Sequence, residues 1–373
     1  MSPDAPVRER APLSYSIRRS PYFERTLAAG AIDFMVYNHT YMPMGYGRDP
    51  REDYRALVER VTLWDVGAER QCELRGPDAL ALADHLAPRR LSDLGVGECR
   101  YTPVCDRAGT IMCECIVLRP WADVVWFSHS DVDLSLWAAG IALARGGDVT
   151  VAEADVAPLQ LQGPRAADVL AGLADADLAG LGRHRCAAMR VAGVDAVVSN
   201  TGWSREAGYE IYPLGSDRAG ELWDALCAAG EPYGLLVTGP NIVRAVEQGI
   251  SDTQYATNSD MNPIEAGIGS LLDLDRDFVG GDALRAVRDR GPARRTVGLV
   301  CDGDPFPPME QHWPVAAVNG DAAGVARWAV YSFALERNIA VCLVDSRLEA
   351  GAGLVVQAPD GPRRGEPHPV PFV

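Results

Sequence analysis

Two segments of the chain repeat one pattern, and this repeat restricts the fold more than any other feature of the sequence. The segments CELRGPDALALADHLAPRRLSDL (72–94) and LQLQGPRAADVLAGLADADLAGL (159–181) each read as a strand, a Gly-Pro pair and a helix with apolar residues at helical spacing. Proline is tolerated in the first turn of a helix because its missing N–H would have no partner there. A period this long indicates a duplicated domain, not a solenoid of short repeats.

A β-rich segment and then a helix follow each copy of the repeat. The β-rich segments lie at 100–130 and 186–214, and the helices are expected at 131–146 and 216–229. Residues 50–63 have the apolar spacing of an amphipathic helix and precede the first copy. We therefore expect two similar α+β units, each an antiparallel sheet with helices on one side.

The composition of the chain changes near residue 290. From there on, short strands alternate with turns rich in Gly, Asp and Pro, a pattern typical of a small all-β barrel or sandwich. The segment RDRGPARR at 288–295 is the expected linker. Residues 1–20, rich in Pro, Arg and Ser, are expected to form a loosely attached arm.

Composition argues against several classes of function. The formal net charge of −16 argues against nucleic acid and anionic membranes as partners. All 35 basic residues are arginines, which excludes a P-loop lysine, a Schiff base to pyridoxal phosphate and a lysine general base. Because the sequence shows neither the apolar core of a signal peptide nor a membrane-spanning apolar run, we expect a cytoplasmic protein.

The nine cysteines are interpreted as reduced thiols. Their number is odd, and most of them lie in apolar, strand-like contexts. Cys113 and Cys115 are expected on one face of a strand, but no second Cys or His pair stands at zinc spacing. We therefore expect no metal site.

Two glutamates interrupt apolar strands and stand near aromatic residues. Glu114 lies within TIMCECIVL and Glu210 within GYEIY, so each faces either solvent or a cavity, because burial of an unpaired carboxylate is costly. Tyr101 is expected at the same hairpin end as Glu114, and Trp203 lies in the loop before Glu210. A carboxylate beside an aromatic ring suits a flat heterocycle with an N–C–NH2 edge, such as a pterin or a guanine.

Five segments resemble, in the same order, the motifs of the aminomethyltransferase superfamily, which includes the glycine cleavage T-protein. They are WDVGAERQCELRGPDAL, RYTPVCDRAGTIMCECIV, TGWSREAGYEIY, MNPIEAGIGSLLDLDRDFVGGDAL and VYSFALERNIAVCLV. The N-terminal segment SIRRSPYFERTLAAGAIDFMVYNHTYMPMGYG is more similar to the folate-dependent demethylases related to dimethylsulfoniopropionate demethylase. Those relatives move a methyl group from a sulfonium, an amine or an aryl ether to tetrahydrofolate.

The resemblance implies an α+β, three-domain cloverleaf around a channel that holds tetrahydrofolate. It implies an arm at 1–20, a first α+β domain at 21–66 and 152–242, a second at 67–151 and 243–287, and a C-terminal β-barrel or jelly-roll domain at 290–373. Tetrahydrofolate would act as a co-substrate. The oligomeric state, the methyl donor and the direction of transfer stay open.

The resemblance also implies folate-binding residues at matching positions, namely Tyr101, Glu114, Ile116, Trp203, Glu210 and Arg244. Glu210 would grip the pterin N–C–NH2 edge between aromatic walls. Glu114, the implied catalytic residue, stands where the family has an aspartate, so its carboxylate is kept but lengthened by one methylene. The family's helix arginine aligns with Ala245, which leaves open whether Arg244 meets the folate.

Six residues are candidates to line the methyl-donor pocket, with ordinary core packing as the alternative for each. They are Tyr37, His39, Tyr41, Tyr46, Trp126 and His129. A cationic donor favours a pocket of carboxylates and aromatic faces. Glu69 and Arg70 could line the same pocket or form an ion pair with each other.

Three functions compete at this point. The first is a folate-dependent methyltransferase or demethylase that acts on a small molecule. The second is an aminomethyltransferase that needs a lipoylated carrier protein, against which the demethylase-like N-terminus argues. The third is a non-catalytic folate-binding protein of iron–sulfur assembly, against which the missing K-G-C-Y-x-G-Q motif argues.

Overall fold

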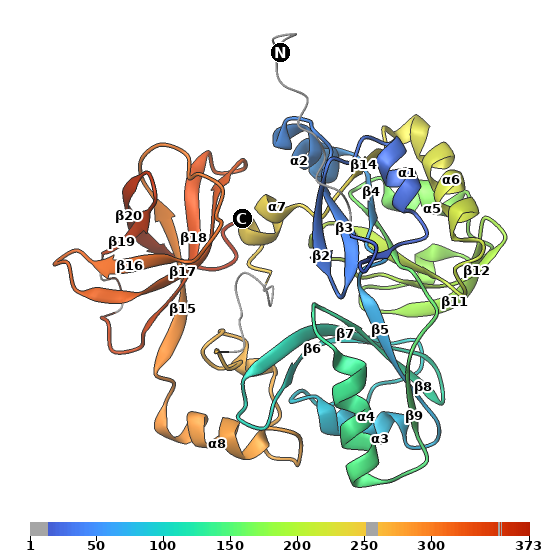
Figure 1. The fold of residues 1–373 in the computed structure, drawn as a ribbon, viewed down its shortest axis with the longest axis horizontal. Helices are drawn as coiled ribbons and strands as arrows, with labels where there is room; N and C mark the ends of the chain where they lie inside the picture. The colour runs from blue at the N-terminus through green and yellow to red at the C-terminus, as the bar shows by residue number, and fades with distance from the viewer. Residues whose placement is uncertain (1–13, 251–259, 350, 352) are drawn as a thin grey trace.

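The computed structural model describes residues 14–250, 260–349, 351 and 353–373. Its elements form three lobes (Figure 1). Two lobes are α+β units and the third, at the C-terminus, is a closed β-barrel. Within the described residues, no helix is long and apolar enough to cross a membrane.

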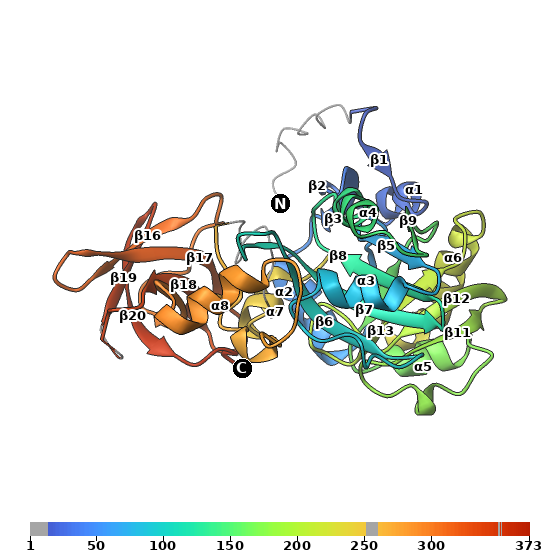
Figure 2. The ribbon, with the colours of Figure 1, turned by 90° about the horizontal axis from the view of Figure 1, so that it is seen from below.

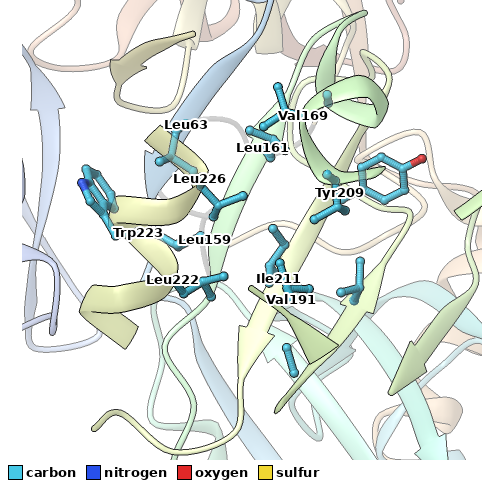
Figure 3. Close-up of a cluster of buried hydrophobic side chains, with 14 of the residues drawn as sticks. Leu63, Leu159, Leu161, Val169, Val191, Tyr209, Ile211, Leu222, Trp223 and Leu226 are labelled. Atoms are coloured by element: carbon cyan, nitrogen blue, oxygen red, sulfur yellow. The ribbon is translucent and has the colours of Figure 1, made fainter. Parts of the chain in front are cut away.

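The first lobe contains a six-stranded sheet in the order β11-β12-β13-β10-β4-β14. Its strands are β4 (Thr62–Asp65), β10 (Leu159–Gln162), β11 (Cys186–Val191), β12 (Val194–Ser199), β13 (Gly208–Pro213) and β14 (Leu236–Thr238). Neighbours are antiparallel except β14, which runs parallel to β4 and which the sequence pattern did not predict. Helices α5 (Ala166–Ala171) and α6 (Ala219–Gly230) cover one face through a core that includes Leu159, Ile211 and Leu222 (Figure 3).

The second lobe contains a five-stranded antiparallel sheet in the order β6-β7-β8-β5-β9. Its strands are β5 (Arg70–Arg75), β6 (Cys99–Cys105), β7 (Ile111–Trp121), β8 (Val124–His129) and β9 (Thr150–Glu153). Helices α3 (Ala79–Leu86) and α4 (Leu134–Arg145) pack on one face, again through buried aliphatic residues. The free faces of the two sheets meet each other through a smaller apolar cluster that includes Trp126, Val197 and Tyr212.

The predicted repeat is present as β5 followed by α3 and β10 followed by α5. Gly76 and Gly163, which end the two strands, have φ values of +133° and +124°. An added Cβ would lie 2.4 Å and 2.6 Å, respectively, from a backbone carbonyl oxygen. The prolines that follow stand two residues before the helices begin, so they belong to the preceding turn and not to the first helical turn as predicted.

The N-terminal region packs against the first lobe. It contains β1 (Arg18–Arg19), α1 (Phe23–Ala28), β2 (Asp33–Tyr37), β3 (Thr40–Gly45) and α2 (Pro50–Glu59). Helix α2 ends before the predicted residue 63 because β4 begins at Thr62. Residues 18–20 of the predicted arm are held by the fold, since β1 pairs with β3 and the Ser20 hydroxyl donates to Asp65. Residues 1–13 lie outside the described residues.

Helices α7 (Ile242–Glu247) and α8 (Gly281–Arg290) lie between the α+β lobes and the barrel (Figure 2). The barrel strands are β15 (Arg294–Cys301), β16 (Trp313–Ala317), β17 (Ala322–Ser332), β18 (Arg337–Asp345), β19 (Leu354–Ala358) and β20 (Gly361–His368). They close in the order β15-β18-β17-β16-β19-β20, which confirms the predicted C-terminal barrel. The predicted linker at 288–295 shrinks to 291–293, because α8 and β15 occupy its ends. Short 3-10 turns occur at Leu178–Gly180, Glu231–Tyr233 and Gly269–Leu271.

Candidate functional site

A cavity of about 560 Å³ lies where the two sheets meet, within the range of about 300–1,000 Å³ typical of small-molecule sites. Strand alternation explains its lining. Glu210 lies on the face of β13 that carries Tyr212 toward the second sheet, whereas Tyr209 and Ile211 face the helices. Seven of the predicted site residues line it, namely Tyr37, Tyr101, Glu114, Ile116, His129, Trp203 and Glu210.

Glu210 is held by a network of protein donors. Its Oε1 accepts from Gln160 Nε2 at 2.8 Å, and its Oε2 accepts from the hydroxyls of Thr201, Tyr212 (3.1 Å) and Ser199 (3.4 Å). Burial raises the pKa of this carboxyl, and the four donors oppose that rise. Oε2 thus has three protein donors and Oε1 has one, so Oε1 keeps more capacity to accept a further donor.

Gln160 joins this network to the rest of the cavity wall, and the sequence analysis missed it. Its Nε2 also lies 3.5 Å from Glu69 Oε1, and its Oε1 accepts from the Trp203 backbone N–H at 3.3 Å. Gln162, two residues further along β10, accepts from the Ser204 hydroxyl at 2.7 Å. Two glutamines in a strand that is otherwise apolar and buried were the available signal.

Glu114 lines the cavity, which decides between the two positions that the sequence left open. It is 7% exposed, and its Oε1 accepts a short hydrogen bond from the Tyr101 hydroxyl. The Glu114 backbone N–H donates to Ser130 Oγ at 3.1 Å. Burial, and then the negative charge of Glu114, raise the pKa of Tyr101 well above its usual value. Tyr101 therefore stays a neutral hydrogen-bond donor to the carboxylate.

Trp203 forms one wall of the cavity and is backed by the barrel. Its indole packs against Trp328 of β17, with ring centroids 6.0 Å apart and an interplanar angle of 39°. The next turn of the loop contains Arg205 at φ +58°, a left-handed conformation that is uncommon for a residue with a side chain. Arg205 also lines the cavity.

His129 and Glu69 also line the cavity. Burial lowers the pKa of His129 to about 4, so the ring is neutral near pH 7, and its Nδ1–H donates to the Ser130 carbonyl oxygen at 2.8 Å. The sequence left open whether Arg70 forms an ion pair with Glu69. In the structure, Arg70 contacts the carboxylate of Glu153.

Four of the predicted donor-pocket residues lie outside the cavity lining, namely His39, Tyr41, Tyr46 and Trp126. His39 is exposed, with Nε2 3.2 Å from Asp133. Tyr41 packs against Phe23, and Tyr46 is 5% exposed. The Trp126 indole N–H donates to Glu73 at 2.8 Å, within the cluster between the sheets. The three aromatic residues are packed in the protein core, which was the alternative considered for each of them.

Arg244 also lies outside the cavity lining, although the resemblance implied that it binds folate. Its Nε donates to Glu206 Oε1 at 2.7 Å and its Nη1 to Glu247 Oε2 at 3.1 Å. Ala245, at the position of the family's arginine, is fully buried against the barrel. Arg244 thus contacts the loop that carries Trp203.

No group of three or more potential metal-ligating side chains occurs among the described residues. The nine cysteines are free thiols, and eight of them are buried. Cys113 and Cys115 share one face of β7, with their sulfurs 3.7 Å apart, and this face packs on the helices, away from Glu114.

Comparisons with known proteins cover nearly the whole chain. The model of the GCVT N-terminal domain matches residues 22–276, and that of the glycine cleavage T-protein C-terminal barrel domain matches residues 294–373. Dimethylsulfoniopropionate demethylase DmdA of Ruegeria pomeroyi is 35% identical over 94% of this chain and 96% of its own. An aminomethyltransferase of Rubrobacter xylanophilus is 31% identical over 95% and 94%, and one of Streptomyces avermitilis is 30% identical over 86% and 87%.

The solved aminomethyltransferase T of the Bartonella henselae glycine cleavage system has the same fold. Its TM-score is 0.86 over 96% of this chain and 98% of that chain, at 21% identity. The predicted cloverleaf fold and the predicted superfamily are both confirmed. The domain boundaries and the residue roles stay predictions.

Proposed function

We propose a function from the family to which the chain belongs, the glycine cleavage T-protein family. The protein is a transferase that moves a methyl group from a small-molecule donor to tetrahydrofolate. The observation that carries this proposal is the similarity to dimethylsulfoniopropionate demethylase along nearly the full length of both chains. The cavity at the meeting of the two sheets is the proposed site of transfer.

The residues of the cavity fit tetrahydrofolate. Glu210 Oε1 and Glu69 supply acceptors for the N–H donors at the pterin edge, and Trp203 supplies an aromatic face for the ring. Tetrahydrofolate, when bound, supplies the nitrogen that receives the methyl group. Gln160 orients both acceptors, because its amide contacts both carboxylates and the backbone of Trp203.

The negative charge of two glutamates in the cavity lining favours a cationic methyl donor. Glu114 and Glu69 line the cavity, and His129 adds no positive charge near neutral pH because burial lowers its pKa to about 4. Carboxylates and the faces of Tyr37 and Tyr101 attract a sulfonium or a quaternary ammonium group more than a neutral aryl ether. The Tyr101 hydroxyl fixes the carboxylate of Glu114 toward the place where this cation would lie.

A second candidate is the aminomethyltransferase reaction of a glycine cleavage system. It is favoured by relatives of that name at 30–31% identity. This function would need a lipoylated carrier protein as a partner. The two candidates differ in the one-carbon unit that tetrahydrofolate receives, which is a methyl group in the first and a methylene group in the second.

The test is to incubate the protein with tetrahydrofolate and a panel of donors, and to identify the folate product by mass. The panel contains dimethylsulfoniopropionate, glycine betaine, dimethylglycine and an aryl methyl ether. We expect 5-methyltetrahydrofolate from a cationic donor. Methylene-tetrahydrofolate formed only with an aminomethylated lipoyl carrier would contradict the proposal and support the second candidate.

The variant Glu114→Gln connects the product to the proposed site. It keeps the shape and the contact with Tyr101 but removes the negative charge, so we expect the turnover rate to fall about 100-fold. The matched control is Glu221→Gln, a change of an exposed glutamate on α6. Unchanged turnover in Glu114→Gln would remove Glu114 from the mechanism.

A further inference from the structure

One wall of the cavity carries an excess of positive charge in a protein whose net charge is −16. Arg89, Arg100 and Arg183 all line the cavity. Arg100 is partly compensated, since it lies 2.5 Å from Asp93 and 4.0 Å from Glu98. Within the described part of the chain, no carboxylate lies within ion-pairing distance of Arg89 or Arg183.

Arg89 is a half-buried cation next to other cations. Its Nη1 donates to the Tyr101 carbonyl oxygen at 2.8 Å, and a guanidinium has five N–H donors in all. Burial, and then the charge of Arg100, lower the pKa of Arg89. The pKa of the neighbouring His184 is lowered in the same way, by burial and by the charges of Arg183 and Arg89. When no anion is bound, repulsion between these positive charges therefore destabilises this wall of the cavity.

We infer that Arg89 and Arg183 form a carboxylate-binding subsite of this cavity. The inference rests on the proposed function, because both proposed ligands offer a carboxylate. Tetrahydrofolate has carboxylates in its glutamate tail, and a donor such as a sulfonio-carboxylate has one of its own. A guanidinium binds a carboxylate through two parallel N–H donors, and Arg89 keeps donors free for this contact.

The subsite is connected to the reacting side of the cavity through one residue. Arg89 holds the backbone of Tyr101, and the hydroxyl of the same tyrosine holds Glu114. An anion on Arg89 and a cation beside Glu114 would thus bind to two residues that Tyr101 of β6 connects, one through its carbonyl oxygen and the other through its hydroxyl. This arrangement separates the negative part of the bound ligands from the methyl-donor cation.

The experiment compares three forms of the protein, namely wild type, Arg89→Gln/Arg183→Gln and the single variant Arg183→Gln. Arg183 is exposed, so its single variant tests the subsite without a risk to folding. Affinity is measured by titration calorimetry for tetrahydrofolate and for tetrahydrobiopterin, which has a related reduced pterin ring but no glutamate tail. The control Arg107→Gln removes the same charge from an exposed position in the β6–β7 turn, outside the cavity lining.

If the carboxylate belongs to tetrahydrofolate, the double variant should lose tetrahydrofolate affinity by about tenfold or more, because a hydrogen bond to a charged group is lost. Tetrahydrobiopterin affinity should then stay at the wild-type value. If the carboxylate belongs to the methyl donor, tetrahydrofolate affinity should hold. The KM for dimethylsulfoniopropionate should then rise, while that for the trimethylsulfonium ion, which lacks a carboxylate, should not. Both outcomes support the subsite.

Affinities and KM values that match those of Arg107→Gln for every ligand would overturn the subsite while leaving the proposed function intact. A wild-type protein that binds neither tetrahydrofolate nor tetrahydrobiopterin would overturn the proposed function, and this inference with it.

Discussion

Asp65, at the end of β4, is a buried carboxyl group, and no arginine or histidine among the described residues forms an ion pair with it. It is 1% exposed and accepts from the Ser20 hydroxyl at 2.5 Å and the Gly67 N–H at 3.0 Å. Burial raises its pKa to about 6, although these two donors act in the opposite direction. The native protein therefore holds a proton on this group at pH values where the unfolded chain, with a pKa of about 3.9, has released it.

The sign of the resulting pH dependence follows from this proton. Between about pH 4 and pH 6 the native state binds more protons at Asp65, so the unfolding free energy falls as pH rises through this window. Two pKa units correspond to about 3 kcal/mol. We expect Asp65→Asn to be stabilised relative to wild type by about 2 kcal/mol on going from pH 4.5 to pH 7.5, because only about 1.5 pH units of this range lie below the native pKa.

Urea unfolding of both forms at several pH values in this window measures the difference. Asp195→Asn, which removes a carboxylate that is 75% exposed, is the charge-matched control. A wild-type-minus-variant difference that stays constant with pH would show that the pKa of Asp65 is not raised by folding.

Sequence reasoning at this scale found both carboxylates of the cavity and Tyr101, the partner of Glu114, but it missed Gln160, a partner of Glu210. Glu114 and Glu210 were visible because a charged residue in an apolar strand needs a reason. Gln160 was not found, because a neutral amide in a strand carries no comparable cost and its contacts cross to β13 and to the Trp203 loop. His39, Tyr41, Tyr46 and Trp126 were included because aromatic residues and histidines serve cores and ligand pockets equally well.

At the scale of elements, the strand–Gly-Pro–helix unit depends on a glycine that no other residue can replace without strain. Gly163 has φ +124°, and a Cβ there would lie 2.6 Å from the Arg60 carbonyl oxygen and 2.8 Å from that of Leu57. We expect Gly163→Ala to lower the unfolding free energy by about 2 kcal/mol or more, because it combines backbone strain with a clash against backbone atoms. Thermal or urea unfolding provides the measurement.

The control for this variant lies nearby in the same unit. Gly172 caps the end of α5 at φ −76°, and its nearest non-neighbouring atom would be 3.8 Å from an added Cβ. Gly172→Ala should leave stability unchanged or raise it slightly. Equal losses in the two variants would mean that the effect comes from the loss of glycine itself and not from the geometry of Gly163.

The repeat predicted the two lobes because both copies use the same local signals, which are a strand, a turn glycine and a helical period. The boundaries were less accurate. The apolar spacing of 50–63 continues past the end of α2 at Glu59, because the next apolar residues belong to β4 and happen to keep the helical period. Strand β14 was missed because three residues are too short for a period to be recognised.

At the scale of the whole molecule, a buried ionic network connects three regions. Glu247 is fully buried and accepts from the Tyr54 hydroxyl of α2 at 2.6 Å and from the Ser332 hydroxyl of β17 at 2.7 Å. It also pairs with Arg244, which pairs in turn with Glu206 beside the Trp203 loop. Helix α7, which carries Arg244 and Glu247, lies between the barrel and the first lobe (Figure 1). No local pattern reveals the whole network, because only Arg244 and Glu247 are close in the sequence and the other partners are 38 or more residues away.

This network predicts that Arg244 supports folate binding as a positioning residue, without touching the ligand. Removing either partner of the Arg244–Glu206 pair should release the Trp203 loop in the same way. We therefore expect Arg244→Gln and Glu206→Gln each to weaken tetrahydrofolate binding by about tenfold, and the double variant to be no weaker than either single variant. Arg218→Gln, which breaks an exposed pair with Glu221, should leave the affinity unchanged. Additive losses, with the larger one in Arg244→Gln, would instead mean that Arg244 contacts the folate directly, as the family resemblance implied.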